Sequence, residues 1–354
     1  MRCHIAPVFA TVASLVLTAC GGGGSDSPQA GSQPAGANPN AYPSVAPVKA
    51  DYFVYTSTIT PTLPLGQTPT QRTVSRDVQS VATGGAFVRL DTFSAISPST
   101  TRNYSADGDE TSRITTALRC DFTPSYRNTP PRGSVVGDKF TSSSKQTCTA
   151  QPGGAVTSVD LVESGTVLAA EPRTVAVGTF DTIKFEHTTT STSAVGVTTT
   201  LETCWVDKLS GRAVECTSAF SSTPNGQTTP TSAGTTAFVL TTYSFNGAAP
   251  VGPAERRFAG TWSVSFAGGS GGSCAALLVD GSGNASGTCQ FTGSTGASTP
   301  FAVSGTVKAN GAATVAAGTA TTGASLVGTF SSPSTASGTW VNGSLSGSWI
   351  ATHQ

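Results

Sequence analysis

Residues 328–349 read GTFSSPSTASGTWVNGSLSGSW, and the pair Gly-Thr or Gly-Ser recurs in this stretch at positions 328, 338 and 347. The pair occurs earlier at positions 260, 287, 305 and 318, so the last four intervals are 13, 10, 10 and 9 residues. Such intervals suit one short strand and one tight turn. With a further strand around residues 276–279, we predict an eight-stranded up-and-down β-barrel over residues 257–354, because closure removes exposed sheet edges. Regular glycines would allow the coiling that closure requires.

The region before this barrel, residues 50–246, also has the pattern of β-strands. Strand-like segments alternate with clusters of Gly, Pro, Asn and Asp. They cover residues 72–81, 86–93, 114–122, 158–168, 179–189, 198–206, 213–220 and 237–245. Residues 175–184 and 204–214 resemble a strand pattern of uncharacterised bacterial envelope proteins with half-barrel sheets. Since no stretch has a convincing helical stripe with caps, we expect an all-β chain whose N-terminal domain is an antiparallel curved sheet or half-barrel.

Two segments of low complexity separate these regions. Residues 20–49 consist mainly of Gly, Ser, Pro, Ala, Asn and Gln, with Asp26 as the single acidic residue. Such a segment buries too little apolar surface to fold, so it is predicted to be a disordered tether of about 30 Å average span. Residues 247–256, which contain Gly247-Ala248-Ala249-Pro250, are predicted to link the two domains.

The first 20 residues have the features of an export signal. Arg2 and His4 precede an apolar run from Ile5 to Leu17, which is too short for a stable membrane span. We therefore predict a signal peptide over residues 1–19. The sequence Leu17-Thr18-Ala19-Cys20 resembles the lipobox of bacterial lipoproteins, which implies that Cys20 is acylated and anchors the mature chain in a membrane. An ordinary secretory peptide next to a cysteine is the alternative.

The resemblance to lipoproteins also bears on location. Lipoproteins kept at the inner membrane commonly have Asp after the acylated cysteine, whereas residue 21 is Gly. The expected location is therefore the outer membrane, with the body facing the periplasm or the cell surface.

The charge balance excludes one class of partner. The chain has 19 basic and 19 acidic residues, so it lacks the basic surplus typical of nucleic-acid binding. Charged residues make up only 11% of the chain, but 37% hydrophobic content with two-residue alternation favours sheet over disorder.

Six cysteines remain beyond the export segment, and an even number in an exported chain predicts disulfides. A hairpin that pairs residues 204 and 216 leaves Leu209-Ser210-Gly211 as a favoured three-residue loop. The same construction pairs residues 274 and 289, and exclusion pairs the last two. The predicted disulfides are Cys120–Cys148, Cys204–Cys216 and Cys274–Cys289. Because no CxxC motif occurs, no metal site is expected.

Catalytic motifs are missing from the predicted barrel. Its ionisable side chains of interest, Asp280, Lys308 and His353, fall on separate hairpins or at the terminus, whereas acid–base catalysis needs positioned groups close together. Residues 268–272 match G-x-S-x-G, but the flanking segments are strand-like and no helix follows, so a hairpin loop is expected. We therefore expect no enzyme activity and no cofactor.

Two polar features of the first domain were considered as ion sites. Asp107-Gly108-Asp109-Glu110 is the densest acidic stretch, and Asp-Gly between strands predicts a turn, with a calcium site as the alternative. His187, beside Glu186 at the end of a predicted strand, is expected to be a solvated strand histidine.

The barrel tryptophans have two interpretations. Trp262, Trp340 and Trp349 either fill the interior of a small barrel or form an aromatic ligand wall at its mouth. Gly260-Thr261-Trp262 together with the two later tryptophans resembles the avidin family in architecture. Residues 328–340 resemble the C-terminal segment of the barrels of transferrin-binding and factor H-binding surface lipoproteins, although the segment here is shorter and has Ser332 in place of a glycine. These resemblances imply a barrel and no ligand-binding residue.

The sequence thus predicts a non-enzymatic binding or interaction module, held at a membrane through Cys20, with a surface protein or a glycan as the possible partner. A structural or assembly lipoprotein without a ligand is the alternative. An enzyme that uses acidic residues of the N-terminal domain is the third possibility.

Overall fold

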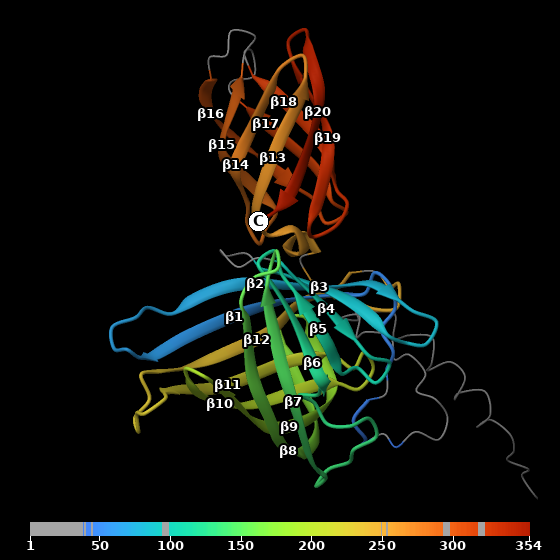
Figure 1. The fold of residues 1–354 in the computed structure, drawn as a ribbon. Coiled ribbons are helices and arrows are strands. Elements are labelled where there is room, and N and C mark those ends of the chain that lie inside the picture. Colours follow the sequence, from blue (N-terminus) through green and yellow to red (C-terminus); the bar gives the residue numbers. More distant parts are fainter. Residues whose placement is uncertain are drawn as a thin grey trace, which may run out of the picture. The chain divides into compact units, whose positions relative to one another are not determined.

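The computed structural model describes residues 38, 40–43, 45–93, 99–248, 250–252, 254–292, 298–317 and 323–354. These residues form two closed antiparallel barrels and one short 3-10 helix, η1 (Ala254–Phe258), as Figure 1 shows. The prediction of an all-β chain is confirmed. Within the described ranges, no helix has the length and apolar character needed to cross a membrane. The predicted signal peptide, Cys20 and the tether up to residue 37 lie outside the described residues.

The first barrel has twelve strands in sequential order, and β1 pairs with both β2 and β12. The expected open sheet or half-barrel is therefore closed. The strands are β1 (Tyr52–Leu63), β2 (Thr70–Val81), β3 (Phe87–Phe93), β4 (Thr100–Tyr104), β5 (Glu110–Ile114), β6 (Leu118–Tyr126), β7 (Lys139–Ala150), β8 (Val156–Val175), β9 (Gly178–Ser193), β10 (Gly196–Asp207), β11 (Ala213–Pro224) and β12 (Ser232–Ser244).

Three strands of this barrel were not among the predicted segments: β1, β4 and β7. The sequence of β7, KFTSSSKQTCTA, has hydroxyl or charged side chains at most positions on both faces, so it lacks the apolar alternation that marks a half-buried strand. Its partners β6 and β8 fix it through continuous pairing. Once these strands are included, the sheet is long enough to close.

Apolar side chains fill part of the first barrel. One cluster contains Phe140, Phe185 and Cys204, and a second contains Tyr55 and Leu240. Both clusters join strands that are not neighbours in the sheet, so their side chains meet inside the barrel. The clusters identify the inner face of the strands that contribute to them, since alternate residues point to the same side.

The end of the expected tether contributes to this core. Ala41 forms a β-bridge with Val135, and the backbone N–H of Tyr42 donates to the carbonyl of Ser134 at 2.6 Å. The Tyr42 ring is buried and meets Phe185 edge to face. The described residues near position 42 therefore pack into the first barrel.

The second barrel has the eight strands that the glycine pattern predicts. They close in sequential order, with β13 paired to β20. The strands are β13 (Gly260–Gly268), β14 (Gly271–Val279), β15 (Asn284–Thr292), β16 (Ser298–Val307), β17 (Ala312–Ala317), β18 (Ala324–Phe330), β19 (Thr335–Asn342) and β20 (Leu345–His353). The G-x-S-x-G sequence lies at the β13–β14 hairpin, as expected.

The recurrent glycines of this barrel make room for tryptophan rings. A Cβ atom on Gly328 would lie 2.4 Å from Trp349 Cζ2 and 2.3 Å from the carbonyl oxygen of Ser337. A Cβ atom on Gly347 would lie 2.6 Å from Trp340 Nε1. The glycine pattern is thus a packing requirement, because a side chain at these positions would occupy the space of the rings.

The three predicted disulfides are present, and each joins neighbouring strands. They are Cys120–Cys148 between β6 and β7, Cys204–Cys216 between β10 and β11, and Cys274–Cys289 between β14 and β15.

Candidate binding site in the first barrel

The interior of the second barrel is filled by its own side chains. Trp262, Trp340 and Trp349 are at most 5% exposed and belong to one apolar core. The void among the core residues measures about 10 Å³, which is at the lower limit for one water molecule. The ligand wall considered for these tryptophans is therefore not formed, since the rings pack against glycines inside the barrel.

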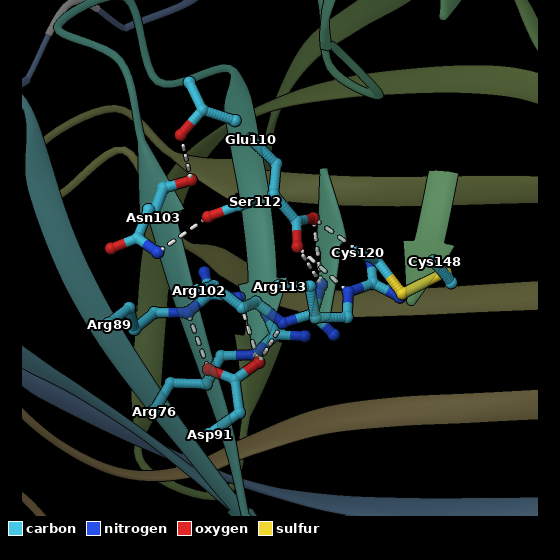
Figure 2. Close-up of polar contacts among 11 residues, drawn as sticks. Arg76, Arg89, Asp91, Arg102, Asn103, Glu110, Ser112, Arg113, Cys120 and Cys148 are labelled. Atoms are coloured by element: carbon cyan, nitrogen blue, oxygen red, sulfur yellow. Dashed lines mark hydrogen bonds and ion pairs between the residues drawn. A yellow bond between two sulfur atoms is a disulfide. The ribbon is translucent and has the colours of Figure 1, made fainter. Parts of the chain in front are cut away.

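The first barrel has a charged inner wall on strands β2 to β5 (Figure 2). The register places Arg76 opposite Asp91, and Arg102 opposite both Arg89 and Arg113. Directly opposed residues point to the same face of a sheet, so the charged side chains converge. The wall continues to the Cys120–Cys148 disulfide, because Cys120 lies opposite Arg113.

Asp91 is the first of two carboxylates in this wall. Arg89 donates to it in bidentate fashion, from Nε at 2.7 Å and Nη2 at 3.0 Å. Arg102 Nε lies 2.8 Å from Asp91 Oδ2. Burial alone would raise the pKa of Asp91, but Arg89, Arg102 and Arg76 outweigh it and lower the pKa to about 2. Asp91 is therefore ionised, with both oxygens engaged.

Glu110 is the second carboxylate. Arg113 donates to it from Nε at 2.9 Å and Nη2 at 3.1 Å, and Arg102 Nη1 donates to both of its oxygens. A register shift in β5 turns Glu110 toward the same face as Arg113. Both carboxylates are therefore shared between two arginines, and little acceptor capacity is left.

Arg76 stands at the end of this network without a full partner. Its Nε lies 3.9 Å from Asp91 Oδ2, too far for a hydrogen bond. Its guanidinium instead lies over the rings of Phe238 and Tyr55, at 4.5 and 5.1 Å from the centroids. Burial and repulsion by Arg89 lower the pKa of Arg76, since no neighbouring charge fully compensates it.

Arg212 and Arg72 also have a buried nitrogen without a hydrogen-bond partner. The guanidinium carbon of Arg212 lies 5.7 Å from the ring centroid of Phe53 and 5.7 Å from that of Phe87. Its pKa is lowered by burial and by repulsion from Arg89. Among the described residues, the buried atoms without a hydrogen-bond partner include Arg72 Nε, Arg76 Nε and Arg212 Nη2.

The inner wall at these arginines is reached by water. The side chains of Arg76, Arg102 and Arg113 keep 29%, 20% and 32% of their surface exposed, although they lie on the inner face of a closed barrel. An eight-stranded barrel is just wide enough to be filled by side chains, so twelve strands leave additional space inside. We refer to this water-accessible interior of the first barrel as the lumen.

A histidine and two glutamates occupy the wall of strands β8 to β10. His187 Nδ1 lies 2.9 Å from Glu163 Oε2, and its Nε2 lies 3.0 Å from Glu202 Oε2. Thr189 and Tyr126 donate to Glu163 Oε1. Burial would lower the pKa of His187, but the two glutamates raise it to about 9, so the ring is an imidazolium at neutral pH.

The prediction of a solvated strand histidine was therefore wrong. His187 is 3% exposed, because it faces Gly165 on β8 and Glu202 on β10 across the inner face. Sequence alone does not give the register that brings these strands together. Glu202 also lies near the sulfurs of Cys204 and Cys216, but their disulfide leaves no thiolate for a metal ion.

The acidic stretch at residues 107–110 forms a turn, as predicted. Gly108 takes a positive φ of 86° between β4 and β5. Asp109 pairs with Arg127 at 2.7 Å, and Glu110 belongs to the arginine network. These two carboxylates of the stretch considered for calcium are therefore neutralised by arginines.

A groove on the outer face offers a competing location. It has a volume of about 360 Å³ and is lined largely by small and hydroxyl side chains of β1 and β10 to β12, among them Thr203 and Thr217. These two residues alternate with Cys204 and Cys216, which face inward, so the groove lies outside the barrel. It holds no charged lining residue.

Comparisons with protein-family models, with curated proteins and with solved structures gave no match to this chain.

Proposed function

We propose that this protein is a membrane-anchored envelope lipoprotein that binds a small ligand in the lumen of its first barrel, without transforming it. The anchor is Cys20, as the lipobox resemblance implies, and the outer membrane is the expected location. The observation that carries the proposal is the surplus of arginines on the inner wall, where four arginines share two carboxylates and the Arg76 side chain is 29% exposed.

A cation on an inner wall without a hydrogen-bonded carboxylate is costly for a fold, so it indicates that something other than stability maintains it. Buried charges in proteins are ordinarily paired and hydrogen-bonded. Arg76 and Arg212 contact aromatic rings but lack a hydrogen-bonded carboxylate for the nitrogens named above. A bound ligand that supplies the missing acceptors would offset this cost.

The proposed role is binding, because the acid and base groups of the wall are engaged with one another. His187 is held between Glu163 and Glu202, and Asp91 and Glu110 are held by arginines. A structural or assembly lipoprotein remains the second candidate, and the observation that favours it is the filled interior of the second barrel.

A ligand screen with two matched variants tests this proposal. Saturation-transfer NMR would be recorded on the purified full mature chain with a mixture of small anionic, cationic, neutral and sugar compounds. Ser218→Trp places a bulky ring on the inner face of β11, and Thr217→Trp places it on the outer face.

We expect at least one compound to bind the natural chain and the Thr217→Trp variant but to bind Ser218→Trp at least tenfold more weakly. The absence of any binder, or loss of binding only in Thr217→Trp, would contradict the proposal. Circular dichroism would establish that both variants keep the β-spectrum of the natural chain.

A further inference from the structure

We infer that the ligand of the lumen carries a doubly charged oxyanion, a phosphate monoester or a dicarboxylate, that is held by Arg76 and Arg212. This inference rests on the proposed function and names the chemical class of the ligand. It follows from the charge balance of the wall, the contacts of Arg76 and Arg212 with aromatic rings, and the 29% exposure of the Arg76 side chain.

The charged wall contains more arginines than carboxylates. Within the described network on β2 to β5, Arg76, Arg89, Arg102 and Arg113 share the carboxylates of Asp91 and Glu110, so two positive charges remain. Arg212 also faces this region, where its guanidinium meets the rings of Phe53 and Phe87, and Asp51 is the acidic residue that acts on its charge.

Two carboxylates against one imidazolium leave one negative charge on the opposite wall, which offsets only part of this surplus. Glu163 and Glu202 are hydrogen-bonded to His187, which is itself protonated at neutral pH, and Glu163 is fully buried beneath Thr189 and Tyr126. Part of their negative charge is therefore neutralised within that cluster. The region around Arg76 and Arg212 stays positive.

The surplus cations are arginines, and this residue type points to an oxyanion. Arginine presents its N–H groups in a planar fork that matches the two oxygens of a carboxylate or phosphate. The Arg76 guanidinium lies near the rings of Phe238 and Tyr55 and has no carboxylate within hydrogen-bond distance. The Arg212 guanidinium lies near the rings of Phe53 and Phe87.

The positions of these rings also limit where the anion can lie. Phe53 and Tyr55 are alternate residues on the inner face of β1, and the Arg212 guanidinium lies over the first ring and the Arg76 guanidinium over the second. Arg89 is already engaged in bidentate fashion by Asp91. An oxyanion next to Tyr55 would therefore meet Arg76 and Arg212 as its uncompensated partners. Two such cations favour a dianion over a singly charged group.

Titration calorimetry with defined probes tests the inference. The probes are inorganic phosphate and phenyl phosphate for the phosphate class, succinate for the dicarboxylate class, acetate as the monoanion and succinamide as the neutral analogue of succinate. The full mature chain would be compared with Arg76→Met and Arg212→Met. Arg119→Met is the control, because Arg119 pairs with Asp121 on the outer face and both are about half exposed.

We expect a dianion to bind at least tenfold more tightly than acetate, and succinamide to show no binding. Each of Arg76→Met and Arg212→Met should weaken the dianion at least tenfold, whereas Arg119→Met should not change it. Affinity should fall with added sodium chloride, because the interaction is electrostatic. Comparison of the phosphate arm with the succinate arm identifies the class.

Different failures have different meanings. Equal dianion affinity in the natural chain and in both arginine variants would overturn the inference. A neutral or cationic compound that binds the lumen in the NMR screen, unaffected by Arg76→Met, would also overturn it but leave the proposed function standing. If Arg76→Met does not fold, Arg76→Lys keeps the charge without the planar fork. A dianion affinity in Arg76→Lys equal to that of the natural chain would again contradict the inference.

Discussion

At the scale of single residues, Glu110 and Asp91 stabilise the charged wall of the first barrel. Each carboxylate accepts from two arginines that come from neighbouring strands, so each links β-strands through side chains as well as through the backbone. Such a network is sensitive to loss of one member, because the remaining charges stay in place without a partner.

Removal of the Glu110 charge is expected to destabilise the first barrel. In Glu110→Gln the shape is kept, but Arg102 and Arg113 lose their shared anion, and breaking a buried ion pair typically costs about 3 kcal/mol or more. Urea denaturation followed by tryptophan fluorescence measures the change. Asp121→Asn is the matched control, because the Arg119–Asp121 pair is exposed and should give no measurable change. An equal loss of unfolding free energy in Glu110→Gln and Asp121→Asn would contradict the claim that burial makes the Glu110 network important.

His187 should give the first barrel a pH-dependent stability. Its pKa is about 9 in the folded chain and 6.5 as the ordinary value, so the folded state holds the proton more tightly. This stabilising contribution is complete below pH 6.5 and is lost as the pH rises toward 9. Thermal melting between pH 6 and 9.5 should show this decline, and His187→Gln should flatten it. An unchanged slope in the variant would assign the pH dependence to other groups.

At the scale of strands, the glycine pattern leaves room for two tryptophan rings. Strands β18, β19 and β20 have glycines at the positions that face Trp340 and Trp349. Because these positions carry no side chain, the rings pack directly against the strand backbones. The two tryptophan rings therefore pack against neighbouring strands on the inner side of the barrel.

A methyl group on one of these glycines should destabilise the second barrel. In Gly328→Ala the new Cβ meets the Ser337 carbonyl oxygen and the Trp349 ring, and neither can move away easily, which predicts a loss of about 1 to 3 kcal/mol. Gly84→Ala is the control, because a Cβ there meets no atom within 4 Å. The change in unfolding free energy would be measured for both. A stable Gly328→Ala variant would show that the rings repack.

The sequence predicted the second barrel more fully than the first for a physical reason. Its strands repeat a regular glycine spacing and alternate apolar with polar residues, so strand number and closure could be inferred. The first barrel includes polar strands such as β7, which carry no apolar alternation, and its closure depends on them.

The disulfides were predictable and the charged wall was not, because the wall depends on strand register. Cys204 and Cys216 are 12 residues apart and pair across one local hairpin. Register shifts among the strands from β2 to β6, by contrast, decide which charged side chains share the inner face, and Arg212 comes from the distant β10–β11 hairpin. Their proximity depends on the register and closure of the whole barrel, which residue spacing does not specify.

At the scale of the molecule, the two barrels are built for different interiors. Eight strands enclose a dry core around Trp262, whereas twelve strands enclose a lumen with charged walls. In the proposed account the anchor keeps both barrels at the membrane and the first barrel holds the ligand.

The proposed lipid anchor at Cys20 can be tested by substitution. Cys20→Ala removes the thiol that would be acylated, so the variant should appear in the soluble fraction of cells, whereas the natural chain should sediment with membranes. Fractionation followed by immunoblotting would measure this. A variant that still sediments with membranes would contradict the assignment of Cys20 as the anchor.

Chemical modification of arginines in the folded, full mature chain tests the central claim most directly. Phenylglyoxal modifies accessible guanidinium groups, and peptide mass spectrometry locates the modified residues. The account predicts that Arg76 on the water-accessible inner wall is modified many times faster than Arg89, which Asp91 holds in bidentate fashion. If Arg76 reacts as slowly as Arg89 until the barrel unfolds, the wall is closed to solvent and the lumen is not a binding site.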